Sequence, residues 1–244
     1  LGGKSANIIF DDASIDQAIE GIIQGIYFNQ GHVCCAGSRL FVQEGILEEV
    51  KSKLLVRLAS LRVGDPMDKN TDIGAINSRA QLEKIREYLD VGVSEGAELC
   101  VGGAGQEVAA GERRGDASRG AIERSRAGLP DKGYWCRPCF FANVQPSHRV
   151  ACEEIFGPVL AVMSFRTPEE AIVRANNSPY GLAAGVWTDK GSKIFEVARK
   201  LEAGVVWLNT YDRFDAASPF GGFKESGFGR EGGMQGLRPY VELN

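Results

Sequence analysis

The chain has 244 residues, of which 43% are hydrophobic and 25% charged, and its formal net charge is −4. This size allows one large α/β domain or two small ones, and the slightly acidic balance gives no reason to expect nucleic acid or an anionic membrane as a partner. No apolar run reaches the roughly 20 residues of a membrane-spanning helix and no secretory signal is visible, so we expect a cytoplasmic protein.

Strands and helices are predicted to alternate along most of the chain. Short apolar runs indicate strands, and apolar residues at i, i+3, i+4 and i+7 indicate helices. In chain order, the predicted elements are a strand at 7–10, a helix at 15–27, a strand at 39–43, helices at 50–61 and 78–93, strands at 98–101, 134–144 and 159–165, a helix from 168, a strand at 182–188, a helix at 191–202 and a strand at 204–208. This alternation predicts an α/β fold with a mostly parallel sheet and helices on both faces.

Two of these helices begin with strong N-terminal signals. Ser14 and Gln17 have the spacing of a capping box, in which the hydroxyl accepts a hydrogen bond from the backbone three residues later. Thr167 is a predicted N-cap, with Pro168 at the first helical position and Glu170 at the third.

Two stretches lack a regular apolar pattern. Residues 104–133 contain few large apolar side chains, and we expect a long surface loop there. Residues 218–233 are rich in glycine, so their backbone can approach a ligand or another subunit closely.

The segment 28–37 is the strongest candidate for chemistry, because it places Cys34 between Gly31 and Gly37 at a helix-to-strand junction. Side chains at such junctions can reach a cleft rather than the core. A free cysteine is more often a small core residue, but a thiolate there could attack a carbonyl carbon. If the backbone is extended, Cys35 points the opposite way, so we expect only one of the two thiols to face the cleft.

The same segment resembles the catalytic-cysteine motif of the NAD(P)-dependent aldehyde dehydrogenases. The family places its nucleophile three residues after the motif glycine, and from Gly31 this position is Cys34. His32 replaces the customary glutamine beside the nucleophile, and its imidazole could change the stability of the thiolate.

Further stretches match this family in the same order along the chain. Residues 153–159 resemble its Glu-Ile-Phe-Gly-Pro motif, which implies that Glu154 accepts hydrogen bonds from the nicotinamide ribose and that Phe156 packs beside the nicotinamide. Gln81 and Lys84 resemble the residues near the cofactor ribose. The resemblance also implies a substrate pocket, formed by the tunnel walls Phe214 and Phe220, the polar Asn209, and His32 and Cys35 beside the nucleophile.

The chain opens on Leu1-Gly2-Gly3-Lys4, which matches the family's Glu-Leu-Gly-Gly-Lys from its second residue. The general-base glutamate and the nucleotide-binding domain would therefore precede Leu1. We expect residues 1–225 to be the catalytic domain of a longer enzyme, and residues 226–244 to pack on the absent cofactor domain or on a partner subunit. By itself the chain should not oxidise aldehyde. The resemblance implies NAD or NADP as cofactor, a small-molecule aldehyde as substrate, and a homodimer or homotetramer for the full-length protein.

Two other classes of protein stay open. One is a non-catalytic scaffold, since residues 104–133 and the ending at 239–243 resemble an atypical branch with an extra aldehyde-dehydrogenase-like region; the intact Cys34 counts against it. The other is a thiol–disulfide protein, since residues 135–139 resemble the Trp-Cys-Gly-Pro-Cys site of thioredoxin. A strand rather than a helix is predicted after Cys139, and such a helix is what lowers the thiol pKa in thioredoxin. Neither a disulfide framework nor a metal site is expected from six cysteines and two histidines at these spacings.

Overall fold

The computed structural model describes residues 2–102, 129–130 and 132–242. A seven-stranded sheet with strand order β3-β4-β5-β2-β1-β7-β8 forms its centre. Its strands are β1 (Ala6–Ile9), β2 (Arg39–Gln43), β3 (Glu98–Val101), β4 (Cys139–Ala142), β5 (Val159–Phe165), β7 (Ala183–Trp187) and β8 (Val205–Leu208). Neighbouring strands are parallel except β3 and β4, which pair antiparallel. The predicted mostly parallel sheet is confirmed.

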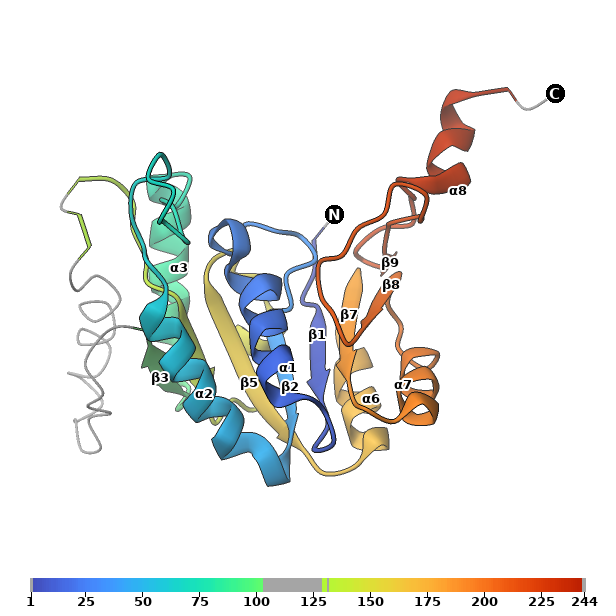
Figure 1. The fold of residues 1–244 in the computed structure, drawn as a ribbon. Helices are drawn as coiled ribbons and strands as arrows, with labels where there is room; N and C mark the ends of the chain where they lie inside the picture. The colour runs from blue at the N-terminus through green and yellow to red at the C-terminus, as the bar shows by residue number, and fades with distance from the viewer. Residues whose placement is uncertain (1, 103–128, 131, 243–244) are drawn as a thin grey trace.

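Helices cover both faces of this sheet, as its two-sided apolar pattern requires (Figure 1). One apolar layer joins the sheet to α1 (Ile15–Ile22) and α2 (Leu47–Ser60). The other joins it to α3 (Arg79–Ser94), α5 (Arg149–Cys152), α6 (Pro168–Asn176) and α7 (Gly191–Ala198). Outside the layers lie a small antiparallel pair, β6 (Tyr180–Gly181) and β9 (Phe223–Lys224), and α8 (Gly233–Leu237).

The helix predicted over 15–27 changes its winding before it ends. After α1, residues Ile23–Tyr27 form a π-helical turn and Phe28–Gly31 a 3₁₀ turn. Gly31 has φ +72°, and a Cβ built on it would lie 2.2 Å from the carbonyl oxygen of Gly157. Only glycine fits this position, and the close approach sets the 28–37 segment against the chain that leads into β5.

The two predicted helix caps have different outcomes. The prediction for Ser14 is wrong, because its side chain makes no capping hydrogen bond. Thr167 does cap α6, since its Oγ1 accepts a hydrogen bond from the backbone N–H of Glu170 at 3.3 Å. The strand predicted over 134–144 is also shorter than expected and comprises only β4.

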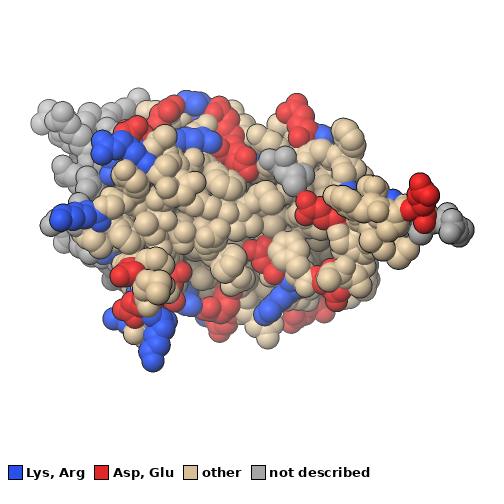
Figure 2. Space-filling view, turned by 90° about the horizontal axis from the view of Figure 1, so that it is seen from above, with Lys and Arg blue, Asp and Glu red and all other residues tan. Residues whose placement is uncertain are grey.

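Parallel strands bring their preceding segments to one edge of the sheet. Residues 3–5 precede β1, 31–38 precede β2 and 153–158 precede β5, and these three strands are neighbours. The segments therefore meet at the amino edge, which is at the top of Figure 1. Seen from above in Figure 2, uncharged side chains make up much of this face.

The C-terminal segment projects away from the sheet (Figure 1). Between residues 226 and 242, Phe228 is 96% and Tyr240 86% exposed. Most of the loop predicted over 104–133 lies outside the described residues. Within the described ranges, no helix is both long and apolar enough to span a bilayer.

Candidate active site

The backbone of Cys34 and the carboxylate of Glu154 both lie beside the chain that enters β1. The backbone N–H of Gly3 donates to Glu154 Oε1 at 3.0 Å. A Cβ built on Gly3 would lie 2.7 Å from the carbonyl oxygen of Cys34, and one built on Gly2 would lie 2.9 Å from Glu154 Oε2. The two glycines thus let the Cys34 segment and the Glu154 carboxylate approach the same stretch of backbone. The structure brings these two predicted residues together.

The Cys34 thiol is half-buried and lies in a turn closed by a hydrogen bond from the N–H of Ala36 to the carbonyl of Val33, 3.1 Å long. Its pKa is lowered to about 6, chiefly by a hydrogen bond from the Cys35 side chain and further by the backbone N–H groups of Cys34 and Cys35. Partial burial and the charge of Glu154 act in the opposite direction. A large fraction of this thiol is therefore thiolate at neutral pH, which is the nucleophilic form.

Cys35 does not line an open pocket, which corrects the prediction made for it. Only 1% of the residue is exposed, whereas Cys34 is half-buried, so only one of the two thiols is accessible, as expected. Its Sγ donates to Asp212 Oδ1 at 3.4 Å, and the Tyr211 hydroxyl donates to its carbonyl oxygen at 2.9 Å. The hydrogen bond to Cys34, together with burial, raises the pKa of the Cys35 thiol.

Asp212 and Tyr211 are parts of the site that sequence reasoning missed. Burial raises the pKa of the Asp212 carboxyl to about 6, although the hydrogen bond from Cys35 opposes this shift. The sequence does show these two polar residues shortly after the predicted strand 204–208, and this was the signal that could have marked them as candidates. Only the three-dimensional structure shows that the chain after β8 turns back, so that both residues contact Cys35.

The loop that carries Glu154 and Phe156 is held by Gln81. The Gln81 amide donates to the carbonyl oxygens of Ile155 at 2.9 Å and Phe156 at 2.8 Å. The side-chain NH₂ group of Gln81 is therefore bound to this loop. Lys84, on the same helix and half-buried, contributes to lowering the pKa of Glu153, after the larger effects of Arg149 and Tyr88.

His32 packs its ring on Phe156. The two rings are stacked with centroids 5.4 Å apart and an interplanar angle of 10°, and Phe156 has φ +57°. Burial lowers the pKa of His32, and its buried Nε2 finds no hydrogen-bond partner among the described residues. The neutral His32 ring is therefore a flat support for the loop that carries Glu154 and Phe156.

The aromatic residues predicted for the substrate pocket form a chain of edge-to-face contacts. Phe214 lies 5.2 Å from Phe220 and 5.4 Å from Trp207 between ring centroids, and it is 59% exposed. Asn209 lies elsewhere: it follows the carboxyl end of β8, and its amide exchanges two 3.0 Å hydrogen bonds with the backbone of Thr188. Its side chain therefore joins two strand ends at the edge opposite the one that Cys34 precedes.

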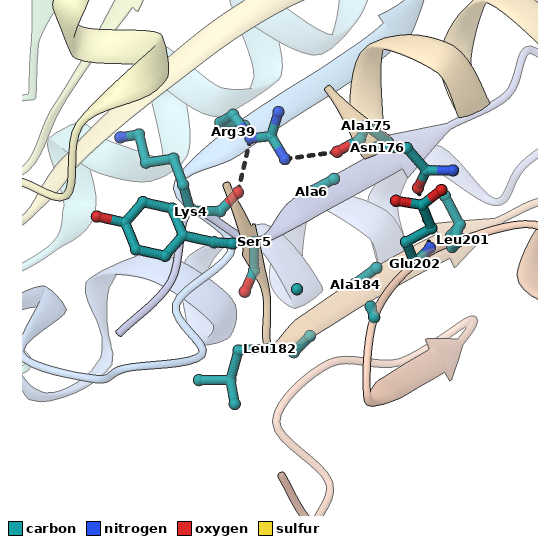
Figure 3. Close-up of a pocket in the computed structure, with 14 residues that line it drawn as sticks. Lys4, Ser5, Ala6, Arg39, Ala175, Asn176, Leu182, Ala184, Leu201 and Glu202 are labelled. Carbon is teal, nitrogen blue, oxygen red and sulfur yellow. Dashed lines mark hydrogen bonds between the residues drawn. The ribbon is translucent and has the colours of Figure 1, made fainter. Parts of the chain in front are cut away.

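A second cluster missed from the sequence is centred on Lys4 and Arg39 (Figure 3). The Arg39 guanidinium donates to the carbonyl oxygens of Lys4 at 2.6 Å, Arg174 at 3.2 Å and Ala175 at 2.7 Å. It thereby ties the start of β1 to the C-terminal end of α6. These residues line a small cavity together with Ser5, Leu182 and Glu202.

The thioredoxin-like cysteines are not arranged for redox chemistry. Cys136 is 2% exposed and Cys139 is fully buried inside β4. Burial raises the pKa of Cys136 to about 12 and that of Cys139 well above its usual value. Both thiols stay protonated and out of reach, so the geometry disfavours the thiol–disulfide alternative.

Comparison with known proteins agrees with this arrangement. The aldehyde dehydrogenase family model matches residues 1–244. The chain is 44% identical to human mitochondrial aldehyde dehydrogenase over 243 residues, which are 100% of this chain and 43% of that protein. It is 44% identical over 243 residues to human retinal dehydrogenase 2, again 100% of this chain and 42% of that protein.

Solved structures give the same result. An aldehyde dehydrogenase from Bacillus cereus, determined as its NAD+ complex, superposes with a TM-score of 0.86 at 42% identity, covering 99% of this chain and 45% of that one. The chain thus spans less than half the length of the relatives it matches. The match over its whole length shows that this chain belongs to the aldehyde dehydrogenase family.

Proposed function

We propose that Cys34 is the nucleophile of an NAD(P)+-dependent oxidation of an aldehyde to a carboxylic acid, carried out by this chain as part of a longer enzyme. The observation that carries the proposal is the half-buried Cys34 thiol at the amino edge of the sheet, with its pKa lowered to about 6. A partly ionised and accessible thiol is what covalent catalysis on a carbonyl requires.

The proposed chemistry begins with attack of the Cys34 thiolate on the aldehyde carbon, which forms a thiohemiacetal. The backbone N–H of Cys34 lies beside this sulfur and helps to stabilise the oxyanion. Loss of hydride from the same carbon leaves a thioester on Cys34. Water then cleaves the thioester, releases the acid and restores the thiol. We expect a carboxylate of the longer enzyme to activate that water.

The residues beside Cys34 fit the nicotinamide end of NAD or NADP. Glu154 uses Oε1 for the Gly3 N–H, and an ionised carboxylate has capacity for further donors such as ribose hydroxyls. The half-buried Phe156 ring, held by His32, offers a flat apolar surface. An NAD(P)+ bound there supplies the hydride acceptor. The Bacillus cereus relative and a betaine aldehyde dehydrogenase from Staphylococcus aureus were both determined with NAD+, the latter also with a BME-modified cysteine.

The test is turnover of an aldehyde by the protein expressed from its complete reading frame, followed by NADH or NADPH absorbance. We expect Cys34→Ala to reduce the rate at least about a thousandfold, since loss of a covalent nucleophile removes most of the catalysis. Cys136→Ala, at a buried cysteine away from the site, should retain the wild-type rate. A Cys34→Ala enzyme with unchanged turnover would contradict the proposal and favour a non-catalytic scaffold.

We also infer that the exposed apolar residues of segment 226–242 pack on a cofactor domain or a partner subunit of a homodimer or homotetramer. Large apolar side chains this exposed commonly mark interaction surfaces. None of the six cysteines, all of which lie in the described ranges, forms a disulfide, and this supports a reducing, cytoplasmic location.

A further inference from the structure

One face of α3 holds the segment 153–157 along its length. Gln81, Ile85 and Tyr88 follow one another at i, i+4 and i+7, so their side chains share a face of the helix. The Gln81 amide donates to two carbonyl groups of the segment, and the Tyr88 hydroxyl reaches its first residue. Between them, a Cβ built on Gly157 would lie 2.5 Å from Ile85 Cδ1. The segment is therefore fixed to a single rigid element.

Glu153 is the anchor at the start of this segment. Its two carboxylate oxygens each accept a hydrogen bond from the Arg149 guanidinium at 2.9 Å, and Oε2 also accepts one from the Tyr88 hydroxyl at 2.6 Å. The Arg149 guanidinium carbon lies over the Tyr88 ring, 5.2 Å from its centroid. All three side chains contact one another, and a bidentate arginine fixes the direction of a carboxylate as well as its distance.

Arg149 is itself held against α3. Its backbone N–H donates to Glu95 Oε2 at 2.9 Å, and its Nη1 lies 3.6 Å from Glu87 Oε1. Its carbonyl oxygen accepts a hydrogen bond from the N–H of Glu153 at 2.8 Å. The pKa of Glu153 is lowered to about 2, chiefly by Arg149 and next by Tyr88. Glu153 is therefore ionised throughout the neutral range, and the network does not titrate there.

Stability alone is a weak reason for this network, because exposed ion pairs contribute little to it. The side chains of Arg149 and Glu153 are each 42% exposed. What the network fixes is the backbone directly before Glu154, while Gln81 fixes the backbone directly after it. The Glu154 carboxylate is then held at Oε1 by the Gly3 N–H.

Resting on the cofactor role proposed for Glu154, we propose that Glu153 is a positioning residue, which Arg149 and Tyr88 hold so that Glu154 presents its carboxylate to NAD(P)+. Without this anchor, Glu153 loses its contact with α3 and the backbone before Glu154 is free to move. Part of the binding free energy of the cofactor is then used to order the loop. Cys34 makes no contact with this network, so its reactivity should not change.

The test is the dissociation constant of NAD+ and of NADP+, measured by calorimetric titration of the protein expressed from its complete reading frame. Glu153→Ala removes the anchor and should raise the constant of the preferred cofactor about tenfold, whereas Tyr88→Phe removes one hydroxyl and should raise it about threefold. Glu153→Gln keeps an acceptor for Tyr88 and should recover part of the loss. At saturating cofactor, kcat should stay within about twofold of wild type, and the rate of Cys34 alkylation by iodoacetamide should be unchanged.

Glu196→Ala is the matched control. The Lys200–Glu196 pair at the end of α7 has the same i,i+4 spacing and 2.9 Å distance as the Arg149–Glu153 pair, and its loss should leave cofactor binding unchanged. The double variant Arg149→Ala/Glu153→Ala should bind no more weakly than the worse of its two single variants, because both changes break one contact. If an alanine variant does not fold, Tyr88→Phe decides, since it preserves the buried ring.

The outcomes separate this role from the proposed function. Unchanged cofactor binding in Glu153→Ala and Tyr88→Phe, together with weaker binding in Glu154→Gln, would overturn the positioning role and leave the proposed function intact. Slower alkylation of Cys34 in parallel with the loss of binding would show general damage to the site and would also overturn it. If Glu154→Gln binds cofactor as tightly as wild type, the proposed cofactor contact is itself wrong, and the positioning role is lost with it.

Discussion

At the scale of single residues, Lys4 is a cationic side chain that folding removes from water. Its amine is fully enclosed, and no hydrogen-bond partner for Nζ appears among the described residues. Burial, followed by the charge of Arg39, lowers the pKa of Lys4 from 10.5 to about 7, although Glu154 opposes this shift. Desolvation disfavours the ammonium form, so Lys4 loses its charge in the folded protein well before it does so in the unfolded chain.

This pKa shift makes the stability of the protein depend on pH. Between about pH 7 and 10.5 the unfolded chain keeps the Lys4 proton that the folded state has released, so this residue makes stability rise with pH there. We expect Lys4→Met, which preserves volume, to be more stable than wild type below about pH 7, with the difference shrinking as pH rises. Urea unfolding midpoints across pH measure it.

The control for this experiment is Lys190→Met, because the Lys190 side chain is 67% exposed and its variant removes an amine from the surface. Buried tyrosines and cysteines also titrate at alkaline pH, but they are common to all three proteins and cancel in the difference. A Lys4→Met effect that is the same at every pH would show that the ammonium is not being desolvated on folding.

At the scale of elements, α6 is held at both ends by side-chain hydrogen bonds, and the one at its C-terminal end comes from a residue next to the candidate site. Thr167 caps its N-terminus, and Arg39 donates to the carbonyl oxygens of Arg174 and Ala175 at its C-terminus. A cation at that end also interacts favourably with the helix dipole. Because Arg39 begins β2, directly after the Cys34 segment, α6 helps to fix the position where that segment ends.

The two predicted caps give a matched pair of variants. Thr167→Ala should lower the free energy of unfolding by about 1 kcal/mol, which is typical for loss of an N-cap hydrogen bond. Ser14→Ala should change it by only a few tenths, because Ser14 makes no capping bond. Chemical unfolding of the two variants measures the difference, and equal losses would contradict the assignment of the caps.

At the scale of the whole molecule, the C-terminal segment exposes several large apolar side chains to solvent. Phe228 is 96% exposed, and Met234 and Leu237 are about half exposed. If this surface packs on a cofactor domain or a second subunit, a charge placed there must be buried or must break the contact.

In the protein from the complete reading frame, we expect Phe228→Asp to lower the mass measured by light scattering if the contact lies between subunits. If it lies within one subunit, the unfolding midpoint should fall instead. Met67→Asp is the control, since Met67 is 90% exposed in a turn on another part of the molecule. A Phe228→Asp protein equal to this control in both mass and stability would rule out the proposed packing role.

Many residues of the candidate site could be predicted because they belong to short sequence motifs. The positions of Gly31, Cys34, Glu154 and Phe156 follow from local patterns, and the structure gathers them because β1, β2 and β5 are adjacent parallel strands. Asn209 shows the limit of such reasoning. Its type suits an active site, but its place after β8 commits its amide to Thr188.

The sequence by itself determined the α/β alternation, the family resemblance and the identity of the candidate nucleophile, because periodicity, capping residues and motif spacing are local properties. Only the tertiary structure decided what surrounds that residue: Cys35 is buried while Cys34 is half-buried, and Asp212 accepts a hydrogen bond from Cys35 although the two are 177 positions apart. Burial shifted the pKa of Lys4 and of Asp212, and hydrogen bonds lowered that of Cys34, since desolvation and hydrogen-bond partners depend on segments that meet only when the chain folds.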